Sequence, residues 1–305
     1  MPAERRVGMD HAHYDWSPIS TRGVLQWPDG APVALCVLVN LEHMEWYPPA
    51  GSYASPIMGG GLGARSFPDY ARLTHREYGH RVGIFRVLDV LEKHGIPPTV
   101  AMDALTAEHY PYLVRHCLQR QCEIIGHGMS VSRMITSTMS EQEERDYIRT
   151  ATEALTRATG QPPAGWFGPE YGESARTPQL LAQAGIRYVC DWANDEQPYR
   201  LRTTPGELFA LPVLLELDDL HAMWERRVTV DRYGALLAES FATLYRDGAQ
   251  NGRLLVLNLH PWLIGQPFRI GFLDAALGTI MRRQGVWAAT GASIIDWYRR
   301  HIPPA

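Results

Sequence analysis

A histidine between two glycines is the residue of this chain best placed for chemistry. His127 follows the apolar pair Ile124-Ile125, and Gly126 and Gly128 stand on either side of it. Because glycine has no side chain, a ligand or another backbone can approach this turn closely. A core histidine whose ring is fully hydrogen-bonded is the alternative interpretation. The polar residues that follow the turn favour a functional histidine facing a pocket.

A second histidine, His260, ends another apolar run, residues 254–259. Pro261 comes next and fixes the direction in which the chain leaves the histidine. Trp262 follows and is suited to form a wall of a substrate pocket. We therefore predict that His260 is catalytic and that Trp262 contacts substrate.

Three carboxylates also follow apolar runs. Glu42 comes after residues 33–39, and Glu170 and Asp191 follow two later runs. Taken singly, each acid is equally well explained as a rim salt bridge or a helix cap. Their recurrence at the ends of separate apolar runs indicates a shared site.

These residue types match the chemistry of hydrolysis. A carboxylate deprotonates water, a histidine protonates a leaving nitrogen, and a second histidine or a backbone amide holds the oxyanion. The chain contains no Gly-x-Ser-x-Gly nucleophile elbow. We predict Glu42 or Glu170 as the base. His127 and His260 are predicted to act as acid and oxyanion stabilisers, and Asp191 to orient a histidine.

Apolar runs alternate with amphipathic segments along the chain, the pattern of repeated strand and helix units. The segment 84–91 is an amphipathic helix that stops at Gly95, and Ser140 and Glu143 form a capping box for a helix ending at Gly160. Further helices are predicted at 112–119, 177–184, 231–246 and up to residue 298. The predicted strands are residues 33–39, 98–102, 122–126, 165–168, 186–192, 207–213, 254–260 and 286–290.

A chain with about eight strands, most followed by a helix, favours a (β/α) barrel over an open sheet. In such a barrel the carboxyl ends of the parallel strands meet at one mouth, where catalytic groups gather. The predicted catalytic residues then come from five different strands; they are Glu42, His127, Glu170, Asp191 and His260. Asn40 alternates onto the same strand face as Glu42 and is expected to contact substrate.

Composition limits the partners of the protein. The chain has 305 residues, 45% of them hydrophobic, with a formal charge of −4 and no run of lysine or arginine. We therefore expect no nucleic-acid or membrane partner and a small, neutral or weakly charged substrate. No apolar signal core and no run of eighteen apolar residues occur, so a cytoplasmic location is expected. The four cysteines lie far apart and have the character of reduced core residues.

The first 30 residues are rich in proline, glycine and tryptophan and show no period. We predict an N-terminal arm, residues 1–30, and a single catalytic barrel domain, residues 31–305, with a loop insertion at 48–75. Trp16 and Tyr53 are among the aromatic residues of the arm and the loop. This apolar surface favours a homo-oligomer in which these segments contact a neighbouring subunit.

Several motifs occur in an order that resembles the polysaccharide deacetylase superfamily. They are an acidic turn after the first strand, the segment 123–128, Gly165-Trp166-x-x-Pro169, Asp191-Trp192 and Leu257-x-x-His260-Pro261. The resemblance covers roughly residues 33–298 and implies a distorted, NodB-like (β/α) barrel of α/β class with about seven to eight parallel strands. It also implies an amidohydrolase-type enzyme that cleaves carbon–nitrogen bonds.

Three further motifs are similar to the branch that holds allantoinase-like proteins and cyclic imide hydrolases. They are Arg76-Glu77-Tyr78-Gly79-x-Arg81-Val82-Gly83, Asp191-Trp192-x-Asn194-Asp195-x-x-Pro198-Tyr199 and His260-Pro261-x-x-x-Gly265-Gln266-Pro267. On this resemblance, Tyr78, Arg81 and Trp192 join Asn40 and Trp262 as the expected substrate-binding residues.

The chain departs from the superfamily at the metal site. The superfamily's deacetylases usually bind a divalent metal through an aspartate of the first motif and two histidines spaced by four. Here Asn40 and Glu42 stand in the first motif, and Val131 replaces the second histidine. A zinc site needs other ligands, such as Glu42, His43 or His260. The resemblance to the allantoinase-like branch, which works without the metal, favours an enzyme with no cofactor.

The sequence is compatible with three functions. The leading hypothesis is a cytoplasmic hydrolase that opens a cyclic amide, imide or ureide by water attack without the superfamily's metal. The alternative enzyme is a metal-dependent N-deacetylase of a sugar or small amide, with zinc as its cofactor. The third is a barrel that has lost catalysis and only binds a small molecule.

Overall fold

The sheet of this protein is built around one long apolar strand. The computed structural model describes residues 9–50, 52 and 69–301, so most of the predicted 48–75 insertion, Tyr53 included, and both chain ends lie outside the described residues. Strand β1 (Val33–Leu41) is buried along its whole length. Because both of its faces are covered, its sequence is a continuous apolar run and not an alternating one.

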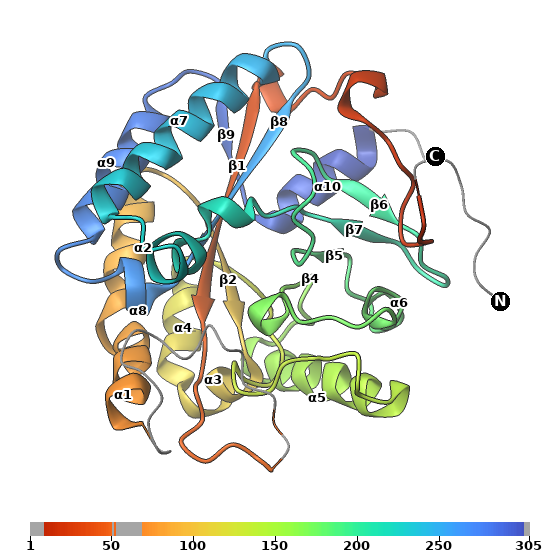
Figure 1. Cartoon of the computed structure of the whole chain (residues 1–305), viewed down its shortest axis with the longest axis vertical. Coiled ribbons are helices and arrows are strands. Elements are labelled where there is room, and N and C mark those ends of the chain that lie inside the picture. Colours follow the sequence, from red (N-terminus) through yellow and green to blue (C-terminus); the bar gives the residue numbers. More distant parts are fainter. Residues whose placement is uncertain (1–8, 51, 53–68, 302–305) are drawn as a thin grey trace.

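One sheet of nine strands contains β1 (Figure 1). The strand order is β6-β7-β5-β4-β3-β2-β1-β8, β9 pairs with β1, and every pair is parallel except β6 with β7. Within the described part of the chain the terminal strands β6 and β8 do not pair with each other, so the sheet curls into a half-barrel. The predicted distorted (β/α) barrel is confirmed. The other strands are β2 (Pro98–Met102), β3 (Glu123–Gly126), β4 (Gly165–Trp166), β5 (Tyr188–Val189), β6 (Tyr199–Leu201), β7 (Leu208–Ala210), β8 (Arg253–Leu259) and β9 (Val286–Ala288).

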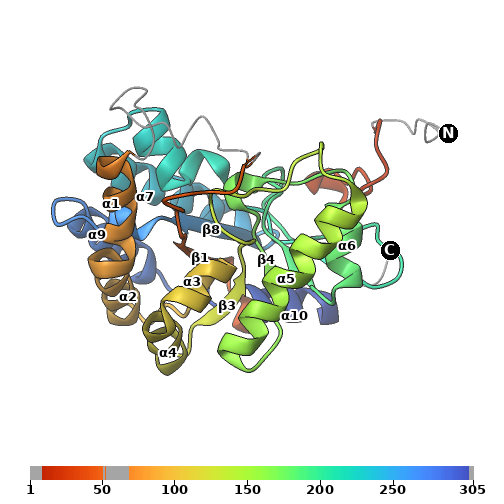
Figure 2. The same cartoon turned by 90° about the horizontal axis from the view of Figure 1, so that it is seen from below.

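Most helices pack against one face of the curled sheet, to either side of β1, and the C-terminal helix packs against the other face. Figure 1 shows α2, α7 and α9 on one side of β1 and α5 and α6 on the other, and the view in Figure 2 agrees. The helices are α1 (Tyr70–Tyr78), α2 (Ile84–Lys93), α3 (Ala104–His109), α4 (Pro111–Gln119), α5 (Glu141–Thr159), α6 (Thr177–Gln183), α7 (Val230–Gly248), α8 (Pro261–Ile264), α9 (Ile270–Met281) and α10 (Gly291–His301). Two π-helices, η4 (Gly79–Gly83) and η7 (Leu220–Glu225), and the 3-10 turns η1 (Ile19–Thr21), η2 (Pro28–Gly30), η5 (Pro169–Tyr171) and η6 (Leu215–Leu217) complete the described elements.

Successive residues of β1 belong to two different cores. Val33, Leu35 and Val37 pack in one core with buried residues of α2 and α7. Ala34 and Cys36 pack in a second core with residues of α10 and the N-terminal arm. Because side chains of a strand alternate between its faces, this one strand joins both halves of the core.

The predicted start and end of helix α5 are confirmed, because both depend on residues close together in the sequence. Ser140 and Glu143 form the expected capping box at the start of α5, and Gly160 ends that helix with a left-handed φ of 80°. Such a backbone conformation favours glycine because it has no Cβ.

The predicted loop insertion ends earlier than residue 75. Helix α1 begins at Tyr70, and Asp69 caps it by accepting the Arg72 N–H at 3.2 Å. The π-helix η4 then continues α1 into α2 without a break. The motif of residues 76–83 therefore lies on helical backbone, which the sequence analysis did not foresee.

Strands are shortest in the half of the sheet around β4, β5 and β7. The segments predicted as strands at 165–168, 186–192 and 207–213 contain strands of two, two and three residues. Strand β6 was missed, because its pairing with β7 is antiparallel and its middle residue is exposed. Because these strands are short, the residues that follow them form turns. Several acids of the site lie in these turns.

The described part of the arm packs on its own chain. The Arg202 N–H donates to His13 O at 2.7 Å, and Trp27, 1% exposed, donates from Nε1 to Arg253 O at 2.7 Å. Figure 1 shows this N-terminal segment beside β6. The four cysteines are buried and none forms a disulfide, as expected. Among the described residues, no helix has both the length and the apolar character needed to cross a membrane.

Candidate active site

Three predicted catalytic residues meet at one edge of the sheet. Glu42 follows β1, His127 follows β3, and His260 follows β8, and all three are buried. Glu42 Oε1 lies 3.3 Å from His127 Nε2 and 3.7 Å from His260 Nε2. The structure brings them together because the carboxyl ends of parallel strands share one edge of the sheet.

Arg76 completes this group, which we call the Glu42 cluster: Glu42, Arg76, His127 and His260. Arg76 lies in α1, its Nη1 donates to Glu42 Oε2 at 3.1 Å, and its guanidinium stands 4.3 Å from the ring centroid of Trp262. The side chains of this ion pair are only 4% and 3% exposed. A buried guanidinium keeps its charge and needs an anionic partner, so Arg76 and Glu42 depend on each other.

Opposite charges set the protonation states of the Glu42 cluster. Burial favours the neutral acid, but the charge of His260, the hydrogen bond from His127 and the charge of Arg76 hold the pKa of Glu42 well below its ordinary value. Burial also disfavours charged imidazoles, yet Glu42 raises the pKa of His127, and Glu42 with Asp219 raises the pKa of His260 to about 10. The charge of Glu42 therefore favours the cationic form of both imidazoles, beside the cationic guanidinium of Arg76.

The ring of His127 is fixed from both sides. Its Nδ1 lies 2.5 Å from the carbonyl oxygen of Phe167. Because a carbonyl only accepts, Nδ1 carries a proton and Nε2 faces Glu42. The imidazole is therefore oriented by backbone on one side and by a carboxylate on the other.

Asp219 orients His260, a role that the sequence analysis gave to Asp191. The Asp219 carboxylate accepts from His260 Nδ1 at 2.6 Å and from the His260 backbone N–H at 2.9 and 3.1 Å. Burial raises the pKa of Asp219 to about 6, although His260 opposes this shift. The sequence offered a signal in the adjacent acids Asp218 and Asp219, but no strand ends beside them.

Asp218 ties three segments to the same pocket. Its Oδ1 accepts the N–H groups of Leu220 and His221 at 2.8 and 3.2 Å. Its Oδ2 accepts from the Tyr171 hydroxyl at 2.7 Å and from Asn258 Nδ2 at 2.6 Å. Asp218 thereby links the start of η7 to the turn η5 and to strand β8.

Glu170 lines the pocket from a strained turn. Its backbone has a φ of 53° and that of Tyr171 a φ of 58°, values that non-glycine residues seldom adopt. Oε1 of Glu170 is buried and has no hydrogen-bond partner. Burial raises the pKa of Glu170, and the nearby charge of Arg76 only partly opposes this. Strain of this kind clusters at functional sites.

Asp191 belongs to a separate acid pair with Glu173. Its Oδ1 accepts the Gly168 N–H at 2.7 Å, and Glu173 contacts the other side of its carboxyl group. Burial raises the pKa of Asp191 to about 7, and burial together with the Asp191 charge raises the pKa of Glu173 well above its ordinary value. The two carboxyl groups share a proton below the turn that carries Glu170, so Asp191 supports that turn.

The predicted substrate-binding residues scatter over the molecule. Asn40 is buried and donates from Nδ2 to Asn258 Oδ1 at 2.6 Å, and Trp262 lies under Arg76. Tyr78 accepts from Arg86, Arg81 is exposed, and Trp192 packs against the arm at 5.5 Å from the Tyr14 ring. The structure thus places Asn40 and Trp262 beside the site and Tyr78, Arg81 and Trp192 away from it.

Close packing explains the glycines of two motifs. A Cβ on Gly83 comes within 2.0 Å of Pro261 O, and one on Gly126 within 2.6 Å of the Trp166 ring. Gly128 has a φ of 66°, and a Cβ there meets the Tyr147 hydroxyl at 2.2 Å. These glycines admit neighbouring protein groups, not a ligand, and that packing positions the histidines.

The residues present do not fit a metal of the superfamily type. Val131 is buried and offers no ligand atom. Among the described residues, Asp218, Asp219 and His260 bring donor atoms within 4.8 Å of one another, a group that includes neither Glu42 nor His127. Every carboxylate oxygen of that group already accepts hydrogen bonds. His260 Nδ1 also donates to Asp219, so this nitrogen carries a proton and offers no lone pair to a cation.

A narrow pocket opens onto the Glu42 cluster. It encloses about 10 Å³, the room of about one water molecule. Its lining residues are Glu42, His127, Phe167, Glu170, Tyr171, Asp218, Leu220, His221, Asn258 and His260. A water held among carboxylates and imidazoles is the arrangement that hydrolysis requires.

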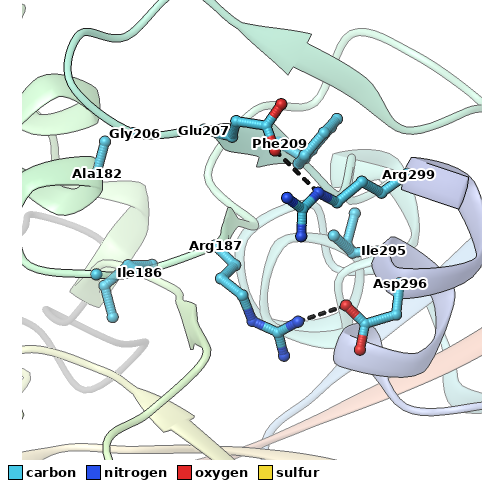
Figure 3. A pocket seen from close by; sticks show the side chains of 10 residues that line it. Ala182, Ile186, Arg187, Gly206, Glu207, Phe209, Ile295, Asp296 and Arg299 are labelled. Carbon is cyan, nitrogen blue, oxygen red and sulfur yellow. Dashed lines mark hydrogen bonds and ion pairs between the residues drawn. The ribbon is translucent and has the colours of Figure 1, made fainter. Parts of the chain in front are cut away.

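A different groove lies at the other end of the strands, between α6, β7 and α10 (Figure 3). Arg299 pairs with Glu207 at 2.9 Å, and Arg187 pairs with Asp296. Glu207 and Arg187 directly precede β7 and β5, so this groove faces the amino ends of the strands. Groups at that face usually serve stability, and catalytic groups stand at the opposite face.

Comparison with known proteins agrees with this fold. The polysaccharide deacetylase family model matches residues 77–189. A Schizosaccharomyces pombe protein whose name proposes a polysaccharide deacetylase is 25% identical over 90% of this chain and 93% of its own length. A peptidoglycan deacetylase of Helicobacter pylori is 21% identical over 80% of this chain and 92% of its own.

The structure of PuuE allantoinase superposes with a TM-score of 0.84 at 24% identity, covering 94% of this chain and 96% of that protein. At this identity the likeness shows the fold. The resemblance to the polysaccharide deacetylase superfamily is confirmed, and the fold is shared with PuuE allantoinase. The matches support a hydrolase of carbon–nitrogen bonds.

Proposed function

We propose that this protein hydrolyses a cyclic amide, imide or ureide by water attack, with protein cations in the place of a metal. The observation that carries the proposal is the Glu42 cluster, in which three cations surround one buried carboxylate. Fixed positive charge in a water-poor site stabilises the oxyanion that forms when water adds to a carbonyl carbon. A protein that only binds a ligand has no need of such a cluster.

Glu170 is the better candidate for the base. An efficient general base has a pKa near the working pH. The pKa of Glu42 lies well below its ordinary value, so this carboxylate is a weak base, whereas the pKa of Glu170 is raised and its Oε1 has no partner. Glu42 then serves to keep His127 and His260 protonated, and these imidazolium groups hold the oxyanion.

A small substrate suits the site better than a polymer. Glu42, His127 and His260 are 6%, 1% and 4% exposed. Phe167, Tyr171 and Leu220 supply the apolar walls of the pocket. A compact ring can enter such a site when the lining moves, and it buries its carbonyl among the cations.

A metal-dependent N-deacetylase is the second candidate, because both curated relatives carry deacetylase names. Against it stands Val131 at the position of the second metal-binding histidine. The two candidates differ in their need for a metal.

The deciding experiment measures turnover of cyclic imides, hydantoins, allantoin and acetylated amino sugars after chelation, with metal content determined by elemental analysis. We expect turnover of a cyclic substrate that chelation does not reduce. Val131→His, which restores the superfamily spacing, is the matched variant and is expected to gain zinc without faster turnover. Stoichiometric zinc in the wild type that restores lost activity contradicts the proposal.

We also propose that the protein is a homo-oligomer through its arm. Trp16 and Val24 are 63% and 65% exposed although the arm packs on its own chain. Such apolar surface is typical of subunit contacts. Light scattering at micromolar concentration tests this, and a strictly monomeric species contradicts it.

A further inference from the structure

A third histidine lines the pocket, and the sequence analysis did not single it out. His221 lies in the π-helix η7 and shares the pocket with His127 and His260. Its side chain is 19% exposed, against 1% for His127 and 5% for His260. It is therefore the histidine through which this pocket reaches solvent.

Glu225 orients the ring of His221. His221 Nδ1 lies 2.5 Å from Glu225 Oε2, one turn further along η7. A carboxylate only accepts, so Nδ1 carries a proton and Nε2 is left to give or take a second one. This carboxylate and histidine pair has the form of a general acid and base at the edge of the site.

The surroundings hold His221 in place. Its backbone N–H donates to Asp218 at 3.2 Å, and its ring lies 5.9 Å from the ring of Tyr171. Asp218 also binds the Tyr171 hydroxyl. Single π-turns occur often at functional sites, and here the turn directs His221 toward the pocket. The titratable groups that share its pocket are Glu42, His127, Glu170, Tyr171, Asp218 and His260.

The two buried histidines are poorly suited to deliver a proton. Both ring nitrogens of each face protein acceptors, because both Nε2 atoms face Glu42, His127 Nδ1 donates to Phe167 O and His260 Nδ1 donates to Asp219. Their protons are also shielded from solvent, so they are replaced slowly after transfer. The leaving nitrogen needs a different donor.

We propose that His221, oriented by Glu225, is the catalytic acid that protonates the leaving nitrogen. This inference rests on the proposed function. Water gives one proton to Glu170 as its oxygen bonds to the carbonyl carbon. The carbon–nitrogen bond then breaks, and the nitrogen takes the proton of His221 Nε2. Glu170 loses its proton and His221 regains one through solvent, so no other reactant is needed.

The test uses the leaving group. Cyclic substrates with nitrogens of graded basicity are turned over by the wild type, His221→Gln and Glu225→Gln. For the most basic nitrogen, His221→Gln is expected to lower kcat by about 100- to 10,000-fold with little change in KM. For an acidic imide nitrogen, which leaves without a proton, the loss should stay below about 10-fold. Glu225→Gln should show the same dependence with smaller losses.

Glu216→Gln is the matched control, because Glu216 is 77% exposed and pairs with Arg226 outside the pocket. It is expected to leave kcat unchanged. Activity of His221→Gln on the acidic imide shows that the variant is folded. Equal losses on all substrates, or none, overturn the role of His221. A wild type that turns over no substrate refutes the proposed function itself, and this inference with it.

Discussion

Two groups of acids lie at the same edge of the sheet and differ in charge, one ionised and the other protonated. Glu42 sits among Arg76, His127 and His260 and stays ionised, whereas Asp191 sits beside Glu173 and shares a proton with it. The charged group is the more deeply buried one, because Glu42 is 6% exposed whereas Asp191 and Glu173 are only partly buried. The partner, and not burial alone, therefore decides whether a carboxyl group in this protein is charged.

Glu42→Gln tests the charged group and has the largest expected effect. It leaves three buried cations without their anion, which costs about 3–5 kcal/mol in the free energy of unfolding. Denaturant unfolding measures this loss. Glu239→Gln is a control at an exposed acid and arginine pair, since Arg232 and Glu239 are 52% and 58% exposed. A Glu42→Gln variant as stable as the control contradicts the cluster.

Glu170→Gln tests whether Glu170 is the catalytic base, with Glu42 serving only to keep the histidines protonated. Removal of a general base should lower kcat by about 100- to 10,000-fold. Stability should not fall, because Oε1 of Glu170 has no hydrogen bond to lose. Steady-state kinetics and denaturant unfolding of the same variant check both parts. A kcat equal to that of the wild type contradicts this role of Glu170 and indicates that Glu42 is the base.

The charged group also predicts how stability depends on alkaline pH. The pKa of His260 is raised from 6.5 to about 10 in the folded protein. The folded state then holds a proton that the unfolded state loses above pH 6.5, so this contribution is present below pH 6.5 and disappears as the pH rises to about 10. Denaturant unfolding across this range should show the decline, and His260→Gln should flatten it. An equal decline in His260→Gln assigns it to another group.

The acid pair predicts a smaller effect in a lower pH range. The raised pKa values of Asp191 and Glu173 mean that the folded state keeps a proton that the unfolded state releases. Stability therefore falls as the pH rises from about 4 to about 7. Asp191→Asn keeps a hydrogen bond to Glu173 without the shared proton and should reduce this fall by about 1 kcal/mol. A pH profile identical to that of the wild type contradicts proton sharing.

Arg187→Gln has the smallest expected effect. Arg187 and Asp296 are each 42% exposed in the groove of Figure 3. Exposed ion pairs contribute about 0–1 kcal/mol, so thermal unfolding and kcat should stay close to wild type. A large loss of kcat contradicts this expectation and indicates that the active site lies at the amino ends of the strands.

The sequence by itself determined the long strands and the residues that end them. The apolar runs of β1 and β8 are covered on both faces, so their pattern is readable without any knowledge of neighbours. Glu42 and His260 follow these runs directly, and His127 follows β3. Parallel pairing then brings these three residues to one edge. Local capping at Ser140 was equally readable because it involves residues three apart.

Only the tertiary structure decided the partners of those residues. Arg76 enters the site in place of Tyr78 and Arg81, because the close approach of Gly83 to Pro261 turns that face of the helix inward. Asp219 replaces Asp191 beside His260 because the start of the π-helix η7, not a strand end, carries it there. Contacts between residues far apart in the chain leave no periodic pattern in the sequence, so their geometry appears only when the chain is folded.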